Sequence, residues 1–217
     1  MLKVKIKKLL DKNSKFDWIE SVPSNASILD IGCGNDSGLK IKSVRSDIIY
    51  HGVDIADYNL SHSGKEAMDK YFVFREDTFL VELEDLSDEY DGVILSHVLE
   101  HVENPYELLT VITKKLKTGG MCFVSFPAIE SVNFPKRNWT LNFYDDPTHF
   151  NVIDSDSLVA KLSVNYKIER YIKRNYGRWS TRILAIMLDL LSGLFKKNNF
   201  LSWYRWGFEV IIRLKKI

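Results

Sequence analysis

The sequence predicts an α/β fold built on a parallel, doubly wound β-sheet. From residue 26 onward, short runs of β-branched and other apolar residues alternate with segments of helical spacing. Each run is apolar on both faces, which is typical of strands that helices cover on both sides of a sheet. An alternation of strand and helix joins parallel strands through right-handed crossovers. With 217 residues, 45% of them hydrophobic, the chain is long enough for one such core.

The predicted elements follow in a regular order along the chain. The strands are expected at residues 27–31, 48–53, 71–74, 92–95, 121–126, 166–172 and 208–214. A helix is predicted at 105–116, because Asn104-Pro105 is a suitable cap and first turn and Gly119-Gly120 is expected to end the helix. A second helix is predicted at 155–162. Ligands of such sheets bind beyond the carboxyl ends of the strands, so the site residues are expected there.

The chain is predicted to form a single domain over residues 1–217 with three additions. These are an N-terminal helical extension (1–25), a loop on the substrate side of the sheet (127–149) and a C-terminal helical insertion (173–207). The loop holds three of the five prolines, and loops of this length in compact domains are usually functional covers. The insertion is built around an apolar segment at 183–195.

Charge is divided unevenly along the chain. The net charge is +1, but the residues from Lys167 onward include twelve Lys or Arg against three acids, so the preceding part carries −8. The overall balance excludes a strongly basic nucleic-acid binder, whereas the basic C-terminal part suits an anionic partner.

Several features predict a cytoplasmic protein. Cys33 and Cys122 cannot form a disulfide framework and lack the spacing of a zinc site, which favours a reducing compartment. The basic N-terminus is not followed by the apolar stretch of a signal peptide. No run approaches the ~20 apolar residues that a membrane span requires.

The strongest functional signal is the segment Ile28-Leu-Asp-Ile-Gly-Cys-Gly-Asn-Asp-Ser-Gly38, where a strand leads into a glycine-rich turn. Gly32 and Gly34 permit tight turns and let a ligand approach the backbone. A strand-to-helix turn that merely needs glycine is the alternative interpretation. Asp36 lies where a dinucleotide-binding fold would hold a pyrophosphate, so the motif disfavours an anion as the ligand.

Polar residues also close the next three predicted strands. Asp54 ends the second strand 24 positions after Asp30, where a carboxylate can hold the hydroxyls of a ribose. The others are Asp77 with Thr78 at the third strand and Ser96 with His97 at the fourth. Each of these residues alone is explained by a surface cap, but their order and spacing together are hard to produce by accident.

These motifs resemble those of class I S-adenosylmethionine-dependent methyltransferases of the small-molecule type. The residues that carry the resemblance are Leu29-Asp-Ile-Gly-Cys-Gly, Gly52-Val-Asp, Glu76-Asp77, Tyr90-Asp-Gly-Val-Ile-Leu-Ser-His-Val-Leu-Glu-His-Val and Leu116-Lys-Thr-Gly-Gly-Met-Cys-Phe-Val-Ser. The resemblance covers about residues 17–172, and the last predicted strand also fits it. It implies a Rossmann-like sheet of seven strands in the order 3-2-1-4-5-7-6, with the last strand antiparallel.

The resemblance further implies which residues bind S-adenosylmethionine. Gly32 and Gly34 would line its methionine part on a loop that Asp30 supports, and Asp54 would hold the ribose. Ile55 would lie against the adenine, and Asp77 with Thr78 would meet its edge. The backbone of Ser96 would lie over the amino acid part. Asp36 departs from the pattern, because many members of the family have glycine at this position.

Three histidines, His97, His101 and His149, are the candidate bases of a methyl-transfer reaction. Transfer from a sulfonium is an in-line displacement, and a hydroxyl acceptor needs a nearby base. His149 is favoured because it lies in the Pro- and aromatic-rich loop, in an Asp-Pro-Thr-His setting that the family shares. The alternative is that His149 only orders the loop. Asp145, Asp146 and His149 together have the side chains of a divalent metal site, but capping of a turn by the two acids is favoured and no metal is predicted.

The methyl acceptor is expected to be a small molecule. Enzymes that methylate nucleic-acid bases or protein amides carry Asn/Asp-Pro-Pro-Tyr after the fourth strand, where this chain has Leu-Ser-His-Val, so nucleic acid is disfavoured. Methyltransferases of this sequence type frequently resemble those of cell-surface polysaccharide pathways, which suggests a sugar hydroxyl by analogy. The alternatives are a non-catalytic module that binds S-adenosylmethionine and an RNA-directed methyltransferase.

The insertion has two interpretations, contact with a membrane or burial against the domain or in a homodimer. Trp179, Trp203, Trp206 and several basic residues, among them Lys196 and Lys197, flank its apolar segment. This composition suits an anionic interface, which predicts peripheral binding at the inner face of the membrane. A helix that is buried against the domain or in a homodimer is the alternative.

Overall fold

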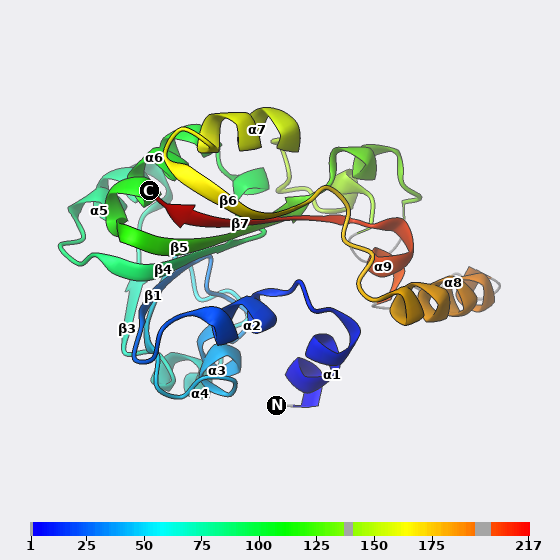
Figure 1. Ribbon diagram of the computed structural model, residues 1–217, viewed down its shortest axis with the longest axis horizontal. Coiled ribbons are helices and arrows are strands. Elements are labelled where there is room, and N and C mark those ends of the chain that lie inside the picture. The colour runs from blue at the N-terminus through cyan, green and yellow to red at the C-terminus, as the bar shows by residue number, and fades with distance from the viewer. Residues whose placement is uncertain (1, 137–140, 194–200) are drawn as a thin grey trace.

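The computed structural model describes residues 2–136, 141–193 and 201–217, and it is organised around a seven-stranded sheet (Figure 1). The strands are β1 (Ser27–Ile31), β2 (Ile49–Asp54), β3 (Lys70–Val73), β4 (Tyr90–Ser96), β5 (Leu116–Pro127), β6 (Tyr166–Ile172) and β7 (Glu209–Lys216). Their order is β3-β2-β1-β4-β5-β7-β6, in which β7 runs antiparallel to both neighbours and the other pairs are parallel. The predicted fold class and strand order are therefore confirmed.

Helices connect the strands and extend the chain at both ends. The α-helices are α1 (Leu2–Leu10), α2 (Lys15–Trp18), α3 (Ser37–Lys42), α4 (His62–Glu66), α5 (Phe79–Asp85), α6 (Pro105–Lys115), α7 (Ser155–Leu162), α8 (Trp179–Gly193) and α9 (Ser202–Trp206). Short 3₁₀ helices are η1 (Ile19–Ser21), η2 (Glu76–Thr78), η3 (Leu99–His101), η4 (Ile129–Asn133) and η5 (Phe143–Asp145). The predicted limits of β1, β6 and α7 agree with those observed.

The end of α6 differs from the prediction. The helix stops at Lys115, whose Nζ donates hydrogen bonds to the carbonyl oxygens of Glu84 and Leu86, and Leu116 already begins β5. The glycine pair that was expected to end the helix lies inside β5, where the pairing with β4 shifts register. Gly119 has a φ of +75°, so glycine is needed for a bulge in the strand rather than for a helix stop.

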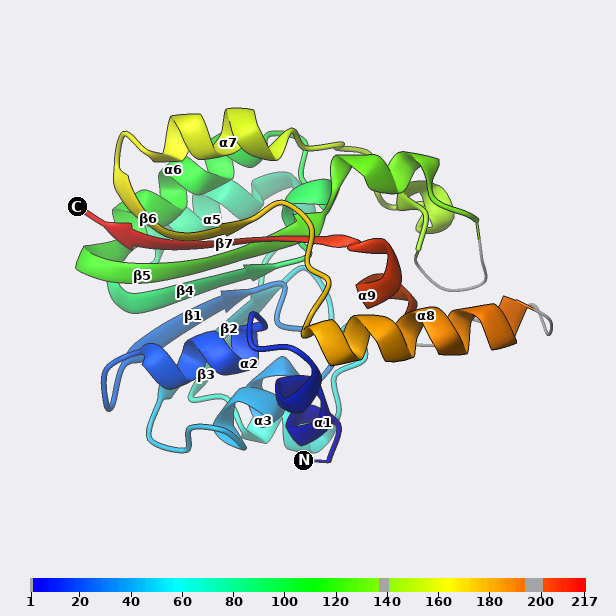
Figure 2. The ribbon, with the colours of Figure 1, turned by 45° about the vertical axis from the view of Figure 1, so that its right-hand side comes forward.

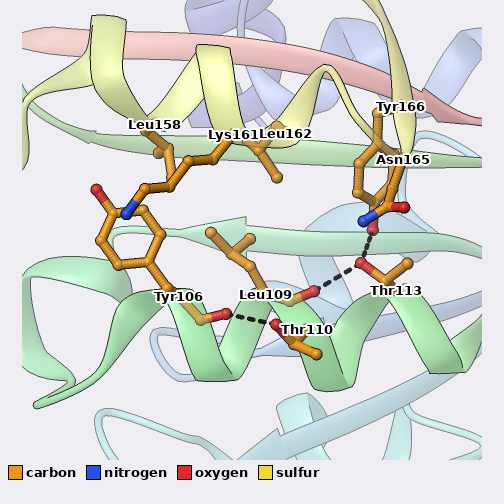
Figure 3. Close-up of a pocket in the computed structure, with 9 residues that line it drawn as sticks. All are labelled: Tyr106, Leu109, Thr110, Thr113, Leu158, Lys161, Leu162, Asn165 and Tyr166. Carbon is orange, nitrogen blue, oxygen red and sulfur yellow. Dashed lines mark hydrogen bonds between the residues drawn. The ribbon is translucent and has the colours of Figure 1, made fainter.

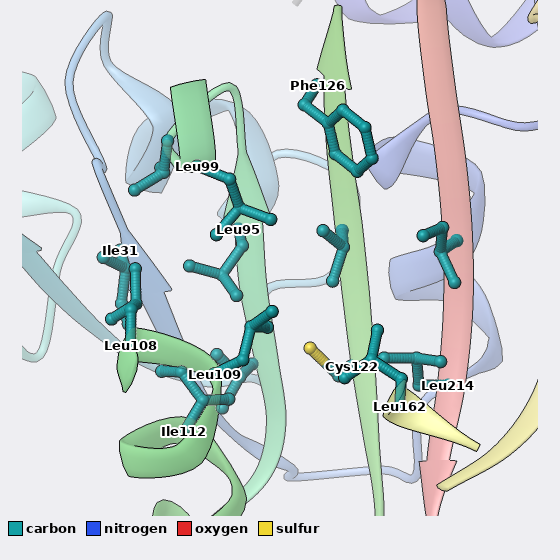
Figure 4. Close-up of a cluster of buried hydrophobic side chains, with 14 of the residues drawn as sticks. Ile31, Leu95, Leu99, Leu108, Leu109, Ile112, Cys122, Phe126, Leu162 and Leu214 are labelled. Atoms are coloured by element: carbon teal, nitrogen blue, oxygen red, sulfur yellow. The ribbon is translucent and has the colours of Figure 1, made fainter. Parts of the chain in front are cut away.

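Helices cover both faces of the sheet (Figure 2). Helices α5, α6 and α7 pack on one face, where Leu108 and Leu162 belong to the same buried apolar cluster as Leu95 and other strand residues (Figure 4). Helices α2 and α3 pack on the other face, where Trp18 is fully buried. Successive side chains of a strand point to opposite faces of the sheet, and in the parallel strands both sets are apolar. Each face of the sheet therefore has its own apolar core, and the two cores hold the carboxyl ends of the parallel strands at one edge.

The C-terminal insertion forms α8 and α9, and α8 projects from the body of the molecule (Figures 1 and 2). The base of α8 is fixed to the end of α1, since the Arg178 amide and the Thr181 hydroxyl both donate hydrogen bonds to the Leu10 carbonyl oxygen. Ala185 is buried against Tyr204 of α9. Lys196 and Lys197 of the predicted insertion lie outside the described residues. Among the residues that are described, no helix is both long and apolar enough to cross a bilayer.

Candidate active site

The turn between β1 and α3 is lined by backbone. Gly32 has a φ of +70°, and a Cβ at this position would lie 2.8 Å from Cγ2 of Val98. A Cβ on Gly34 would lie 2.7 Å from the carbonyl oxygen of Tyr58. The Gly32 amide donates to the carbonyl oxygen of Val53 at the end of β2. Glycine is therefore required at both positions, because a side chain there would displace Val98 or Tyr58.

Asp30 lies beneath this turn and is fully buried. Its Oδ2 accepts hydrogen bonds from the hydroxyls of Ser37 and Tyr50, and Lys15 Nζ lies 3.7 Å away. Its Oδ1 is also buried and has no hydrogen-bond partner among the described residues. An oxygen that folding leaves without a partner is costly, which makes it suited to a donor or a positive charge supplied by a ligand.

Asp54 ties the ends of β1 and β2 together. Its Oδ2 accepts a hydrogen bond from the Gly34 amide at 3.0 Å, and its Oδ1 accepts one from the Ile55 amide at 2.8 Å. Burial raises the pKa of this carboxyl above its ordinary value, although these backbone hydrogen bonds oppose the shift. The side chain of Ile55 is exposed directly beside it. The structure thus brings together Asp30, the two glycines and Asp54.

Asp36, the residue that departs from the family pattern, serves a neighbouring helix. It adopts a left-handed conformation with a φ of 54°. Its Oδ1 accepts hydrogen bonds from the amide and the hydroxyl of Ser61, which hold the pKa of Asp36 below its ordinary value. Ser61 in turn caps α4 by accepting a hydrogen bond from the Gly64 amide. The carboxylate therefore anchors the start of α4.

Asp77 and Thr78 follow β3, but their side chains bond to near neighbours in sequence. Asp77 is exposed and forms a two-point ion pair with Arg75. The Thr78 hydroxyl donates to the carboxylate of Glu82. Both residues lie at the predicted strand end, whereas their side chains are not joined to the Asp30–Asp54 group by any described hydrogen bond.

The carboxyl end of β4 carries Ser96 and His97. The Ser96 hydroxyl lies 3.2 Å from that of Ser125 on β5. His97 has a φ of 58°, which is unusual for a residue with a side chain. Its Nδ1 lies 3.0 Å from Oε1 of Glu100, and its Nε2 lies 3.2 Å from Oε1 of Glu209.

The two carboxylates keep His97 charged. Burial alone would lower the pKa of this imidazole, but the hydrogen bonds to both glutamates outweigh it and raise the pKa to about 9. The ring also packs against Trp203 of α9 and is parallel to Phe208. Because both ring nitrogens are engaged, His97 presents no free lone pair to a substrate.

Glu209 links His97 to distant parts of the chain. The Asn175 amide donates to the Glu209 carbonyl oxygen at 2.7 Å. The Asn175 side chain donates to Asp11 at 2.7 Å. The insertion and the N-terminal extension therefore meet beside the active-site edge.

His149 is buried at the same edge. Its Nδ1 lies 2.8 Å from the carbonyl oxygen of Phe143. Since a carbonyl only accepts hydrogen bonds, Nδ1 carries the proton and Nε2 keeps its lone pair. That Nε2 lies 4.0 Å from Oε1 of Glu100. Burial lowers the pKa of His149 below its ordinary value, so the ring is neutral at pH 7.

The two acids before His149 close turns in the loop. Asp145 Oδ2 accepts hydrogen bonds from the amides of Leu141 and Asn142, which completes a capping box with η5. Asp146 Oδ1 accepts hydrogen bonds from the amide and hydroxyl of Thr148. These contacts agree with the predicted capping of a turn.

Two buried acids at this edge were missed by the sequence analysis. Glu100 is fully buried within a run of apolar residues, and Glu209 begins β7 against His97. An acid enclosed by an apolar run, as in Val-Leu-Glu-His-Val, was the available signal for Glu100. No local pattern marks Glu209.

A surface cavity of about 150 Å³ lies elsewhere, between α6 and α7 (Figure 3). Lys161 lies over the ring of Tyr106 at its rim, 3.5 Å from the centroid. Its walls come from these two helices and from the start of β6, not from the carboxyl ends of the strands, so we do not assign it to the active site.

Comparison with known proteins identifies the family. Residues 3–163 match the family model described as a methyltransferase domain. The chain belongs to this methyltransferase family. A ubiquinone biosynthesis O-methyltransferase of Dechloromonas aromatica is 28% identical over 119 residues, which cover 51% of this chain and 49% of the relative. The chain thus spans about half the length of that curated relative.

Solved structures share the fold of this chain. A SAM-dependent methyltransferase from Archaeoglobus fulgidus superposes with a TM-score of 0.57 at 20% identity, covering 99% of this chain and 93% of that one. The plantazolicin methyltransferase BpumL, solved in complex with SAH, gives a TM-score of 0.59 at 15% identity and covers 99% and 86%. These likenesses show the shared fold.

The methyltransferase domain brings S-adenosylmethionine as its cofactor, and the turn after β1 fits this group. The group is a nucleoside with a positive sulfonium and an amino acid part. The turn offers the backbone of Gly32 and Gly34, where a side chain does not fit. It also offers the carboxylate of Asp54 and an unpartnered buried oxygen on Asp30. Carboxylates and exposed backbone suit a cationic nucleoside better than a pyrophosphate.

Proposed function

We propose that the chain methylates a hydroxyl group of a small-molecule acceptor. The observation that carries this proposal is the Nε2 lone pair of buried His149, which lies at the carboxyl edge of the sheet near Glu100. A hydroxyl acceptor must lose a proton during attack, so it requires such a group more than an amine does. The relative named for O-methylation in ubiquinone biosynthesis supports the same kind of acceptor atom.

In this proposal the chain binds its cofactor at the first two strand ends. Gly32 and Gly34 line the methionine part, Asp30 supports their turn, and Asp54 holds the ribose. The side chains proposed beside the adenine are Ile55, Asp77 and Thr78. The Asp77 carboxylate would have to leave Arg75 to take part, whereas the exposed Ile55 needs no rearrangement. The Ser96 backbone is the proposed contact of the amino acid part.

The protein contributes chiefly by placing the reactants. S-adenosylmethionine supplies an activated methyl group: the acceptor oxygen bonds to the methyl carbon while the carbon–sulfur bond breaks, and its electron pair stays on sulfur. Holding the reactants in line can supply roughly 7–11 kcal/mol of the barrier reduction. We propose that His149 is required for removal of the acceptor proton. His97, with both nitrogens bonded, is proposed to position Glu100 rather than to act as a base.

The proposed reaction is tested with labelled cofactor. The full chain is incubated with S-adenosyl-[methyl-³H]methionine and a small-molecule and lipid extract from cells that lack its gene. We expect label in a methyl ether, identified by mass spectrometry. Label on nitrogen would contradict the hydroxyl acceptor. Normal binding of S-adenosylhomocysteine with no label transfer would favour the non-catalytic module instead, and label in the RNA fraction would favour the RNA-directed alternative.

We also propose that α8 binds an anionic membrane surface. Large apolar side chains are exposed around most of this helix: Trp179, Ile183, Leu184, Ile186, Met187, Leu188 and Leu190. A helix that lies in the head-group region of a bilayer can bury such an apolar surface among the acyl chains. Arg178 and Arg182 at its start, both exposed, suit anionic head groups. This placement supports a lipid-linked sugar hydroxyl of polysaccharide synthesis as the acceptor, reached at the inner face of the membrane.

Co-sedimentation with liposomes of phosphatidylglycerol and phosphatidylcholine tests the membrane proposal. The double substitution Met187→Glu and Leu190→Glu replaces side chains that are 57% and 62% exposed. Because burial of one large apolar side chain is worth roughly 1.5–3 kcal/mol, we expect the partition constant to fall at least about tenfold. Val164→Glu, at a position 75% exposed away from α8, is the matched control and is expected to bind normally. Equal binding by all three proteins, or none by the unaltered chain, would refute the proposal.

A further inference from the structure

Glu100, His101 and His149 form a compact cluster at the carboxyl edge of the sheet. Each offers one ligand atom, and the three atoms lie within 4.8 Å of one another. Glu100 and His101 come from η3, just after β4, and His149 comes from the loop that follows β5. The Glu100 carbonyl oxygen accepts hydrogen bonds from the amides of Phe150 and Asn151, both at 3.1 Å, which fix the two segments side by side.

The hydrogen bonds of both histidines leave one nitrogen of each available. His149 Nδ1 donates to the Phe143 carbonyl oxygen. His101 Nδ1 lies 3.2 Å from the Thr148 carbonyl oxygen and 2.9 Å from its hydroxyl, which itself donates to Asp146. In each ring the proton is therefore on Nδ1 and the lone pair is on Nε2. Histidines that bind metals almost always donate their other ring N–H in this way.

Glu100 supplies an independent indication of a missing partner. The residue is fully buried, its Oε1 contacts His97, and its Oε2 has no hydrogen-bond partner among the described residues. A buried carboxylate oxygen without a donor is strongly unfavourable. The Nε2 lone pair of His149, 4.0 Å from Oε1 of the same carboxylate, cannot satisfy it, because it is an acceptor as well. The carboxylate of Glu100 and the imidazoles of His101 and His149 thus gather acceptor atoms without a donor, an arrangement that suits a cation.

We propose that Glu100, His101 and His149 bind a divalent transition-metal ion, Zn²⁺ in the first instance. Two imidazoles and one carboxylate form a ligand set typical of catalytic zinc, which leaves a position open for substrate, whereas Mg²⁺ and Ca²⁺ prefer oxygen ligands alone. Ligand atoms around one zinc ion are about 3–4 Å apart, given bonds of about 2.0–2.2 Å. The cluster needs to close by only about 1 Å to reach that spacing.

The ion would account for how the acceptor loses its proton, and this part rests on the proposed function. A hydroxyl that occupies the open position is acidified by the ion, as metals lower the pKa of bound water. The proton passes to solvent, the oxygen attacks the methyl carbon, and the electron pair of the carbon–sulfur bond stays on sulfur. His149 is then required as a ligand. This ligand set differs from the set of Asp145, Asp146 and His149 considered from the sequence. Both aspartates close turns, although Asp146 Oδ2 lies 3.8 Å from His149 Nε2 beside the cluster.

Titration of the full chain with ZnCl₂ tests the site without any acceptor. The chain is dialysed against EDTA and then against metal-free buffer, and zinc binding is measured by isothermal titration calorimetry. We expect one equivalent to bind. Glu100→Gln and His149→Ala are each expected to weaken binding at least tenfold. His62→Ala is the control, because His62 also pairs with a glutamate, Glu66, but on the open surface of α4.

The outcomes separate the metal site from the proposed reaction. Substitution of buried Glu100 can affect folding, so His101→Ala, at a partly exposed position, provides a second variant. Visible absorption of the Co²⁺-loaded chain gives a further readout and is expected to change in all three variants but not in His62→Ala. Absence of stoichiometric binding by the folded chain, or equal binding by the variants and the unaltered chain, overturns the metal site. Failure of label transfer with zinc binding intact overturns the proposed function alone.

Discussion

Replacing His149 by alanine is expected to lower kcat for methyl transfer about 10²–10⁴-fold, the usual contribution of a group that assists proton transfer. The affinity for S-adenosylhomocysteine should be unchanged, because the proposed cofactor site consists of Asp30, the two glycines and Asp54, which lie outside the loop of His149. The measurement combines steady-state rates on the acceptor with calorimetric binding of S-adenosylhomocysteine.

His149→Asn separates catalysis from loop order. Asparagine can keep a donor near the position of Nδ1 and so retain the hydrogen bond to the Phe143 carbonyl oxygen, while it lacks a group at Nε2. We expect this variant to be as impaired as His149→Ala. If it retains full activity, the side chain only orders the loop. His62→Ala is the control for loss of an exposed histidine.

Replacing Asp54 by alanine is expected to weaken S-adenosylhomocysteine binding about 10²–10³-fold. The substitution would remove the proposed contacts with the ribose and the hydrogen bonds from the Gly34 and Ile55 amides, and hydrogen bonds to charged groups are worth about 1.5–3 kcal/mol each. Isothermal titration calorimetry measures the affinity, and thermal unfolding monitored by circular dichroism shows whether the variant remains folded.

Asp57→Ala is the matched control for the cofactor prediction. Asp57 lies three positions further on, is exposed, and bonds to Lys65 and the Tyr71 hydroxyl. Its loss should leave the affinity for S-adenosylhomocysteine within about twofold, since surface ion pairs contribute little. Unchanged binding by a folded Asp54→Ala variant would remove Asp54 from the proposed cofactor site.

Much of the fold was predictable because apolar periodicity reports burial directly. The limits of β1 and β6 agree with the prediction, since each strand is bounded by polar or turn-forming residues. The end of α6 was not predictable. The glycine pair there is suited to both a helix stop and a strand bulge, and the anchoring of Lys115 to the carbonyl oxygens of Glu84 and Leu86 decided between them.

The candidate site was predictable where it follows from strand order. Parallel strands bring their carboxyl ends to one edge, and Asp30 and Asp54 are accordingly joined through the glycine turn. Glu209 was not predictable, because it meets His97 across 112 positions of sequence. The same holds for Glu100, whose approach to His149 depends on how the loop after β5 folds back.

The hydrogen bonds of Asn175 have a consequence for the dynamics of the protein. Its amide is bonded to β7 at Glu209, the residue that also holds His97, and its side chain is bonded to Asp11 at the end of α1. Opening of the segment that leads into α8 therefore breaks a hydrogen bond to the residue that also holds His97, which couples the two regions. Segments coupled in this way open as one cooperative unit, which slows hydrogen exchange of their amides together. A surface that captures α8 would thereby protect the active-site edge from opening as well.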